Sequence, residues 1–128
     1  MRYAFLLAVP VAMFGAGPAA SQAPTAINVE LSNFKFTPRT IVLDHGRSYV
    51  LRLHNAASGG HDFTASDFFA AASIAPGDRR WVTEGEVEVP PGQVREIHLT
   101  APGAGNYKLK CSHTLHKSFG MTGHIVVR

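Results

Sequence analysis

The chain has 128 residues, of which 45% are hydrophobic, and a formal net charge of +3 at pH 7. This length suits one domain with a single hydrophobic core. The net charge is small and the Lys and Arg residues are scattered, which argues against a nucleic-acid-binding surface.

The N-terminus has the pattern of an export signal. Arg2 is its only charge, residues 3–14 are almost all apolar, and residues 15–23 are rich in small side chains. This order is typical of a secretory signal peptide, and the apolar run is shorter than the roughly 20 residues of a membrane span. We therefore expect a signal peptide at 1–22, with an approximate cleavage position, and a domain at 23–128 in the periplasm or secreted. A retained N-terminal anchor is the alternative.

After residue 23 the chain reads as short strands between turns rich in Gly and Pro. The strand-like runs are residues 27–31, 33–36, 40–43, 48–53, 86–89, 94–99, 106–111 and 123–127. About seven or eight short strands with frequent turns predict an all-β fold, either a β-sandwich or a barrel.

One segment favours a helix. Residues 66–72 contain three alanines and begin with Ser66, a plausible N-cap, and Pro76-Gly77 would end the segment. We expect one short helical insertion between strands. The large side chains nearby should lie in the core: Phe63, Phe68, Phe69 and Trp81. The carboxylates of Glu84, Glu86 and Glu88 should form a solvated strand face. The alternative is an acidic surface that docks a basic partner.

Cys111 is the only cysteine, so it has no partner for an internal disulfide. Side chains alternate across a strand, which places Tyr107, Leu109 and Cys111 on one face and Lys108 and Lys110 on the other. The apolar face should be the core face, with the thiol pointing inward at the end of the strand. In an oxidising compartment such a thiol needs burial or a metal to protect it.

The cysteine begins a spaced set of metal-binding side chains. His116 and Met121 follow it in the pattern C-x4-H-x4-M, and His61 lies far upstream. One thiolate, two imidazoles and a weak axial thioether are the ligands of a blue-copper electron-transfer site. Zinc is the chemical alternative, but a thioether is not a usual zinc ligand. The other histidines lack ligand spacing and are expected on the surface: His45, His54, His98 and His124.

With these residues in view, the chain resembles the small cupredoxins, the plastocyanin, pseudoazurin and azurin family. The resemblance rests on Phe34-Lys35-Phe36-Thr37-Pro38, residues 49–55, His61, and residues 107–127. It implies a Greek-key β-sandwich that holds one copper ion through His61, Cys111, His116 and the axial Met121. It also implies one-electron transfer between Cu(I) and Cu(II).

Three departures from the family pattern affect the expected site. Asp62 stands where the family commonly has Asn after the first histidine, and its carboxylate could hydrogen-bond Ser112 or a backbone N–H near the cysteine. His113 lies two residues after the cysteine, where it could tune the metal or compete for it. Thr114-Leu115 replaces the Pro-Gly that often precedes the loop histidine. Asp62 and His113 are therefore candidate neighbours of the metal ligands.

These observations lead to a one-electron carrier, expected to be monomeric and non-enzymatic. It would dock redox proteins transiently through an apolar patch near Leu115, Phe119 and Met121. Copper carriage without redox turnover is the alternative, suggested by His113. An oxidase role is disfavoured because the neighbours of Cys111 are Lys110 and Ser112, not histidines that could reach a copper cluster. No nucleophile–base pair or paired-carboxylate motif is evident.

Overall fold

The computed structural model describes residues 10–15, 23–113 and 119–128. Its elements follow one another as β1 Thr25–Ser32, β2 Lys35–Thr37, β3 Thr40–Leu43, β4 Ser48–Asn55, β5 His61–Thr64, α1 Ser66–Ala71, β6 Ser73–Ile74, the 3-10 helix η1 Pro76–Trp81, β7 Glu86–Val89, β8 Val94–Thr100, β9 Gly105–Lys110 and β10 Thr122–Val127. Among these described residues, no helix is long and apolar enough to cross a membrane.

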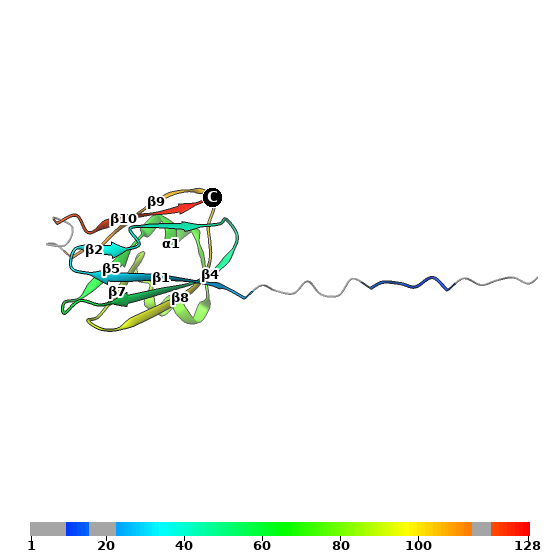
Figure 1. The fold of residues 1–128 in the computed structure, drawn as a ribbon, viewed down its shortest axis with the longest axis horizontal. Helices are drawn as coiled ribbons and strands as arrows, with labels where there is room; N and C mark the ends of the chain where they lie inside the picture. The colour runs from blue at the N-terminus through cyan, green and yellow to red at the C-terminus, as the bar shows by residue number, and fades with distance from the viewer. Residues whose placement is uncertain (1–9, 16–22, 114–118) are drawn as a thin grey trace, which may run out of the picture.

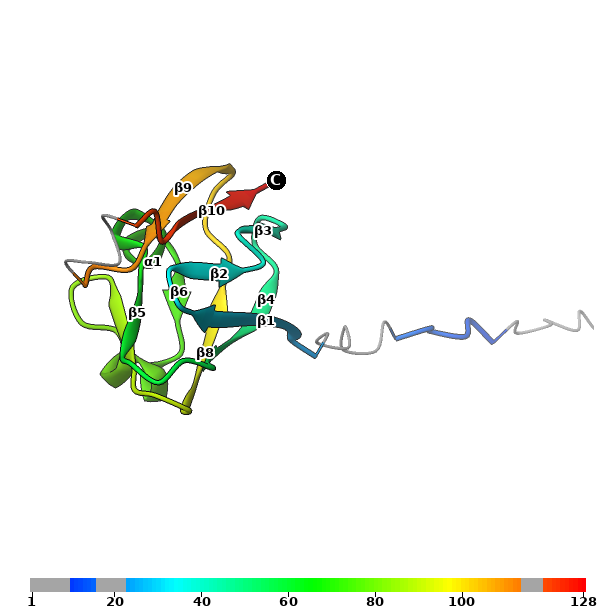
Figure 2. The same cartoon turned by 60° about the vertical axis from the view of Figure 1, so that its left-hand side comes forward.

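Two five-stranded sheets form a sandwich, which confirms the all-β prediction (Figures 1 and 2). The strand order is β2-β1-β4-β8-β6 in one sheet and β3-β10-β9-β5-β7 in the other. Most neighbours are antiparallel, but β1 pairs with β4 and β10 pairs with β3 in parallel. Strands distant in sequence therefore lie side by side, and β5 is placed between β7 and β9.

The alternation of apolar and polar residues explains why these segments form strands with one buried face. In β4 the side chains of Tyr49, Leu51 and Leu53 are buried, while Arg52 and His54 are exposed. Apolar residues of the two sheets meet in a single core between them. In β9 the same rule buries Leu109 and exposes both lysines, as expected.

The first hairpin differs from the prediction. The expected strand at residues 33–36 would have placed Phe34 and Phe36 on one face. Instead Asn33 and Phe34 form the turn between β1 and β2, and Phe34 has a φ of 61°. Phe36 is buried and Phe34 is 40% exposed, because a turn reverses the chain and breaks the two-residue periodicity.

The region between β5 and β7 is more structured than expected. The helix is confirmed as α1, but its N-cap is Ala65 rather than Ser66, and no side chain caps it. Pro76 does not simply end the segment, since it begins η1, where a proline suits the first turn. Phe63, Phe68 and Phe69 are buried as predicted, whereas Trp81 is only partly buried against the core.

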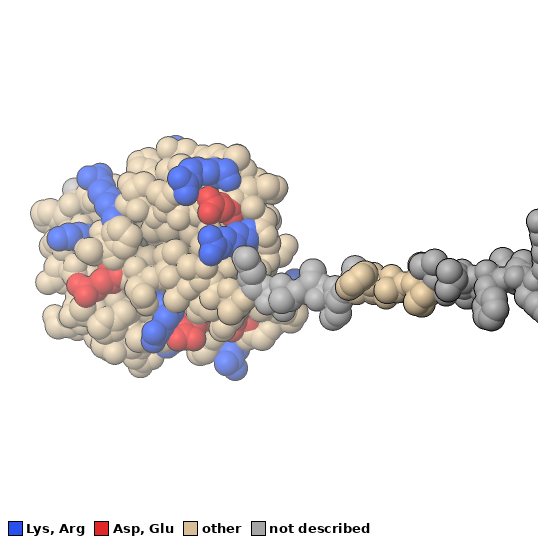
Figure 3. Space-filling view, turned by 45° about the vertical axis from the view of Figure 1, so that its right-hand side comes forward, with Lys and Arg blue, Asp and Glu red and all other residues tan. Residues whose placement is uncertain are grey.

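Charged side chains are mixed in sign over the face drawn in Figure 3, with no continuous basic area. The four histidines expected on the surface are indeed exposed: His45, His54, His98 and His124. This distribution agrees with the scattered charges of the sequence.

Candidate metal centre

His61 and Cys111 are brought together by the order of strands in one sheet. His61 begins β5, and Cys111 follows the last residue of β9. The two strands are neighbours, with Thr64 opposite Lys110. His61 Nδ1 lies 4.0 Å from Cys111 Sγ, although 50 residues separate them in sequence. Their exposed fractions are 1% and 0%, so imidazole and thiol meet inside the protein.

Met121 lies beside the cysteine at the same end of the sheet. The Cys111 N–H donates to the Met121 carbonyl oxygen at 3.0 Å, just before β10 begins. Met121 is fully buried and belongs to the core. Three of the four expected ligands therefore gather where β5, β9 and β10 meet; His116 lies outside the described residues, as do Thr114 and Leu115.

The sulfur of Cys111 accepts a hydrogen bond from the backbone of β5. The Asp62 N–H points at Sγ with a nitrogen–sulfur distance of 3.5 Å. Burial raises the pKa of the Cys111 thiol, and the negative charges of Asp62 and Glu88 raise it further, against backbone hydrogen bonds that lower it. The metal-free protein thus holds a protonated thiol at neutral pH, and a metal that binds the thiolate must displace that proton.

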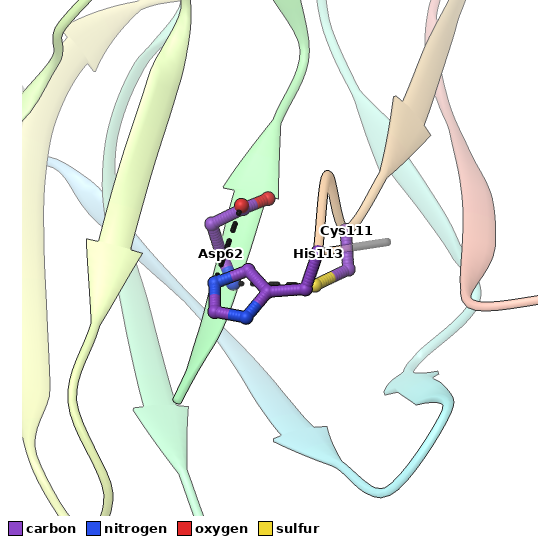
Figure 4. A group of neighbouring side chains, drawn as sticks. All are labelled: Asp62, Cys111 and His113. Atoms are coloured by element: carbon purple, nitrogen blue, oxygen red, sulfur yellow. Dashed lines mark hydrogen bonds and ion pairs between the residues drawn. The ribbon is translucent and has the colours of Figure 1, made fainter. Parts of the chain in front are cut away.

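Asp62 connects β5 to Ser112, the residue after the cysteine. Figure 4 shows Asp62 beside Cys111 and His113. One carboxylate oxygen accepts the Ser112 backbone N–H at 2.8 Å and the Thr64 hydroxyl at 2.8 Å. The other oxygen accepts a hydrogen bond from the Ser112 hydroxyl. The Asp62 side chain is completely buried, so these donors replace the water that a carboxylate normally binds.

His113 lies on the outer side of this carboxylate. Its Nε2 is 3.7 Å from the second oxygen of Asp62 and 3.1 Å from both carboxylate oxygens of Glu88. Possible ligand atoms of Asp62, Cys111 and His113 all lie within 4.8 Å of one another. The structure therefore brings two of the three departures from the family pattern, Asp62 and His113, next to the cysteine.

The β7 carboxylates are closer to the site than the sequence suggested. Asp62 lies opposite Glu88 and Thr64 opposite Glu86 in the β5–β7 pair. Burial raises the pKa of Glu86, and the charges of Asp62 and Glu88 add to this effect. The expected solvated face is confirmed for Glu88, which is exposed, and only in part for Glu86, which is partly buried. Only the pairing of β5 with β7 places Glu86 and Glu88 near the site, and this pairing cannot be read from the sequence.

An exposed aromatic pair lies near the same end of the molecule. Phe34 and Phe119 have ring centroids 4.7 Å apart, and Phe119 is 64% exposed. Met121 is fully buried, so its expected part in an exposed apolar patch was wrong. Leu115, the other expected member, lies outside the described residues.

The chemistry of the described donors fits copper. A buried thiol, an imidazole and a thioether form a soft set that serves both Cu(I) and Cu(II). Zinc fits less well, because methionine is not one of its usual ligands. The surrounding strands restrict the movement of His61 and Cys111, which favours a site whose shape changes little between oxidation states.

Comparison with known proteins identifies the family. A family profile for the cupredoxin-like domain matches residues 4–127, so the chain belongs to the cupredoxin-like family and is a small cupredoxin. No curated protein sequence matches the chain at a significant level.

Solved structures with this fold include several copper proteins. Auracyanin from Roseiflexus castenholzii has 18% identity and a TM-score of 0.61 over 84% of this chain and 99% of its own. Auracyanin A, a blue copper protein from Chloroflexus aurantiacus, has 15% identity and a TM-score of 0.60 over 83% and 100%. The McoA multicopper oxidase from Aquifex aeolicus has 13% identity and a TM-score of 0.63, but this chain covers only 31% of it. These similarities show a shared fold.

Proposed function

We propose that this protein is a type 1 copper protein that carries single electrons between redox partners outside the cytoplasm. The ligands are His61, Cys111 and His116, with Met121 as the axial ligand. The observation that carries the proposal is the meeting of His61 Nδ1 and Cys111 Sγ, 4.0 Å apart and fully buried, beside the buried Met121. Bound copper would supply a one-electron couple at this position.

The protein itself fixes the positions of the donor atoms and shields them from solvent. His61 lies in a strand paired on both sides, with β7 and β9, and Cys111 is tied to Met121 through the backbone. The Asp62 N–H donates to the sulfur, which stabilises a thiolate. Fixed ligands lower the structural change that must accompany each electron transfer, so an electron carrier gains speed from this arrangement.

Spectroscopy and voltammetry test the proposal directly. Copper-loaded protein should be strongly coloured in the Cu(II) state through thiolate-to-copper charge transfer, lose the colour on reduction, and give a reversible one-electron wave. A colourless Cu(II) form would overturn the ligand assignment, and a coloured form without a reversible wave would overturn the carrier role.

Copper carriage without redox turnover is the second candidate function. It is favoured by His113, which lies beside Asp62 and Cys111 and could assist transfer of the metal. Carriage is disfavoured because His113 Nε2 lies 3.1 Å from both carboxylate oxygens of Glu88, so this nitrogen is already engaged by a carboxylate. Rapid transfer of Cu(I) to a competing chelator, combined with no reversible wave, would favour carriage.

We further propose that the protein is monomeric, has no catalytic activity of its own and works in the periplasm or as a secreted protein. The proposal is supported by the auracyanin structures, which match this chain over 99% and 100% of their own length, one of them being described as a blue copper protein. Redox partners would dock transiently beside the exposed Phe34–Phe119 pair. Oxidase activity in the copper-loaded protein would contradict the non-enzymatic assignment.

A further inference from the structure

Asp62 differs from every other carboxylate among the described residues in being fully buried beside the candidate metal ligands. Its exposed fraction is 0%, and the residue directly before it is His61. A buried carboxylate is costly unless hydrogen bonds replace its water. The structure supplies them, and this pattern indicates a specific task for the negative charge.

The contacts of the Asp62 side chain suit an anion. Its oxygens accept the Ser112 N–H and the Thr64 hydroxyl at 2.8 Å each, and also the Ser112 hydroxyl. His113 Nε2 lies 3.7 Å from the second oxygen, and carboxylate oxygens of Asp62, Glu86 and Glu88 lie within 4.8 Å of one another. A carboxylate accepts all of these bonds, whereas a protonated acid would have to donate one.

The same residue connects the two halves of the site. Its backbone N–H donates to Cys111 Sγ, while its side chain holds Ser112, the next residue after the cysteine. Movement of the cysteine relative to His61 would therefore break several hydrogen bonds together. An amide at this position could keep much of this geometry, because it has the same shape with one acceptor oxygen and one donor nitrogen, but it would carry no charge.

We propose that Asp62 is a positioning residue that fastens Ser112 to β5 and places a fixed negative charge beside the thiolate, so that the centre favours oxidised copper. The inference rests on the proposed copper site. A negative charge near the metal stabilises Cu(II) more than Cu(I), and it acts strongly because the surroundings are dry. Asp62 follows His61 in the chain and contacts Cys111 through its backbone N–H, so its carboxylate acts on copper indirectly.

Two kinds of variant separate the charge from the fastening. Asp62→Asn removes the charge and keeps the shape, and Glu30→Gln removes an equal charge from an exposed position on β1 as the matched control. The Ser112→Ala/Thr64→Val double variant keeps the charge and removes two of the hydroxyl donors. Reduction potential, the energy of the charge-transfer band and the rate of Cu(II) loss to excess EDTA are measured at one pH.

Asp62→Asn should bind copper, remain coloured and have a higher reduction potential than the wild type, while Glu30→Gln matches the wild type. The double variant should lose Cu(II) to EDTA several-fold faster without a rise in potential. A purely structural role would change copper loss and unfolding but would not raise the potential of Asp62→Asn alone.

Equal potentials in Asp62→Asn and Glu30→Gln would overturn the proposal. If Asp62→Asn fails to fold, the double variant decides: an unchanged rate of copper loss overturns the fastening role, and a faster rate at an unraised potential supports it. A wild-type protein that binds no copper would instead refute the proposed function, so the two failures are distinguishable.

Discussion

At the scale of single residues, the buried sulfur of Cys111 is the group on which the proposed chemistry depends. Its neighbours are the imidazole of His61 and the backbone N–H of Asp62, and its exposed fraction is 0%. A hydroxyl in its place would be a harder donor than the thiolate, so it would suit copper less well and could not supply thiolate charge transfer.

Cys111→Ser should therefore abolish the intense colour of the Cu(II) form. The serine hydroxyl occupies almost the same space, so the metal-free variant should keep the far-ultraviolet circular dichroism of the wild type. Visible absorption and EPR of the copper-loaded variant provide the measurement. A variant that retains the colour would show that the thiolate assignment is wrong.

Met121 offers a second residue-scale test. Its side chain is fully buried, and leucine is a tolerated replacement for methionine in a core. Met121→Leu should keep copper but raise the reduction potential, because a weak donor that stabilises Cu(II) is lost. Voltammetry measures the shift, and an unchanged potential would exclude methionine as an axial ligand.

At the scale of elements, β10 makes a close backbone contact with the segment before β3, two residues after Met121. A Cβ added to Gly123 would clash with the carbonyl oxygen of Arg39 and would lie 3.2 Å from Leu109 Cδ2. Gly123 also pairs with Leu109 across the β9–β10 ladder. Only a residue without a side chain allows the segment before β3 to approach β10 so closely.

Gly123→Ala should destabilise the protein by about 1–3 kcal/mol, as overpacking against backbone typically does. Gly103→Ala is the matched control, because a Cβ there has no neighbour within 4 Å. Urea denaturation of the metal-free variants measures the difference. Equal stability of the two variants would mean that Arg39 and β10 can separate without loss.

At the scale of the whole molecule, a hydrogen-bonded pair links η1 to the sheet that does not carry the site. Asp78 Oδ2 accepts the backbone N–H of His98 and lies 2.8 Å from its Nδ1. Burial raises the pKa of Asp78, but the hydrogen bonds and charge of His98 outweigh this and the pKa is lowered below its ordinary value of 3.8.

Because the folded-state pKa of Asp78 is lowered, its stabilising effect is complete above about pH 4 and is lost as the pH falls through the lower folded-state value. The side chain of His98 is 47% exposed, so the effect at pH 7 should be below about 1 kcal/mol. Urea midpoints from pH 7 to pH 3 should converge for the wild type and Asp78→Asn. A gap that stays constant over this range would contradict the prediction.

Much of the fold could be predicted from local pattern. Alternation placed the buried faces of β4, β8 and β9, and the alanine-rich segment indicated α1. The predictions failed where local pattern was weak. All four residues of β5 are buried, so β5 has no alternation, and the two-residue β6 is too short to show any.

The amino-acid sequence by itself determined the donor chemistry: a single thiol followed at fixed spacing by His116 and Met121, with the thiol at the inward end of a strand. These features depend on residue type and on periods of two, which act locally. The tertiary structure alone decided which distant groups surround the thiol. Pairing of β5 with β7 and β9 brought His61 to the sulfur and placed Asp62, Glu86 and Glu88 around Ser112 and His113. Register between strands is set by packing of the whole core, so no local pattern contains it.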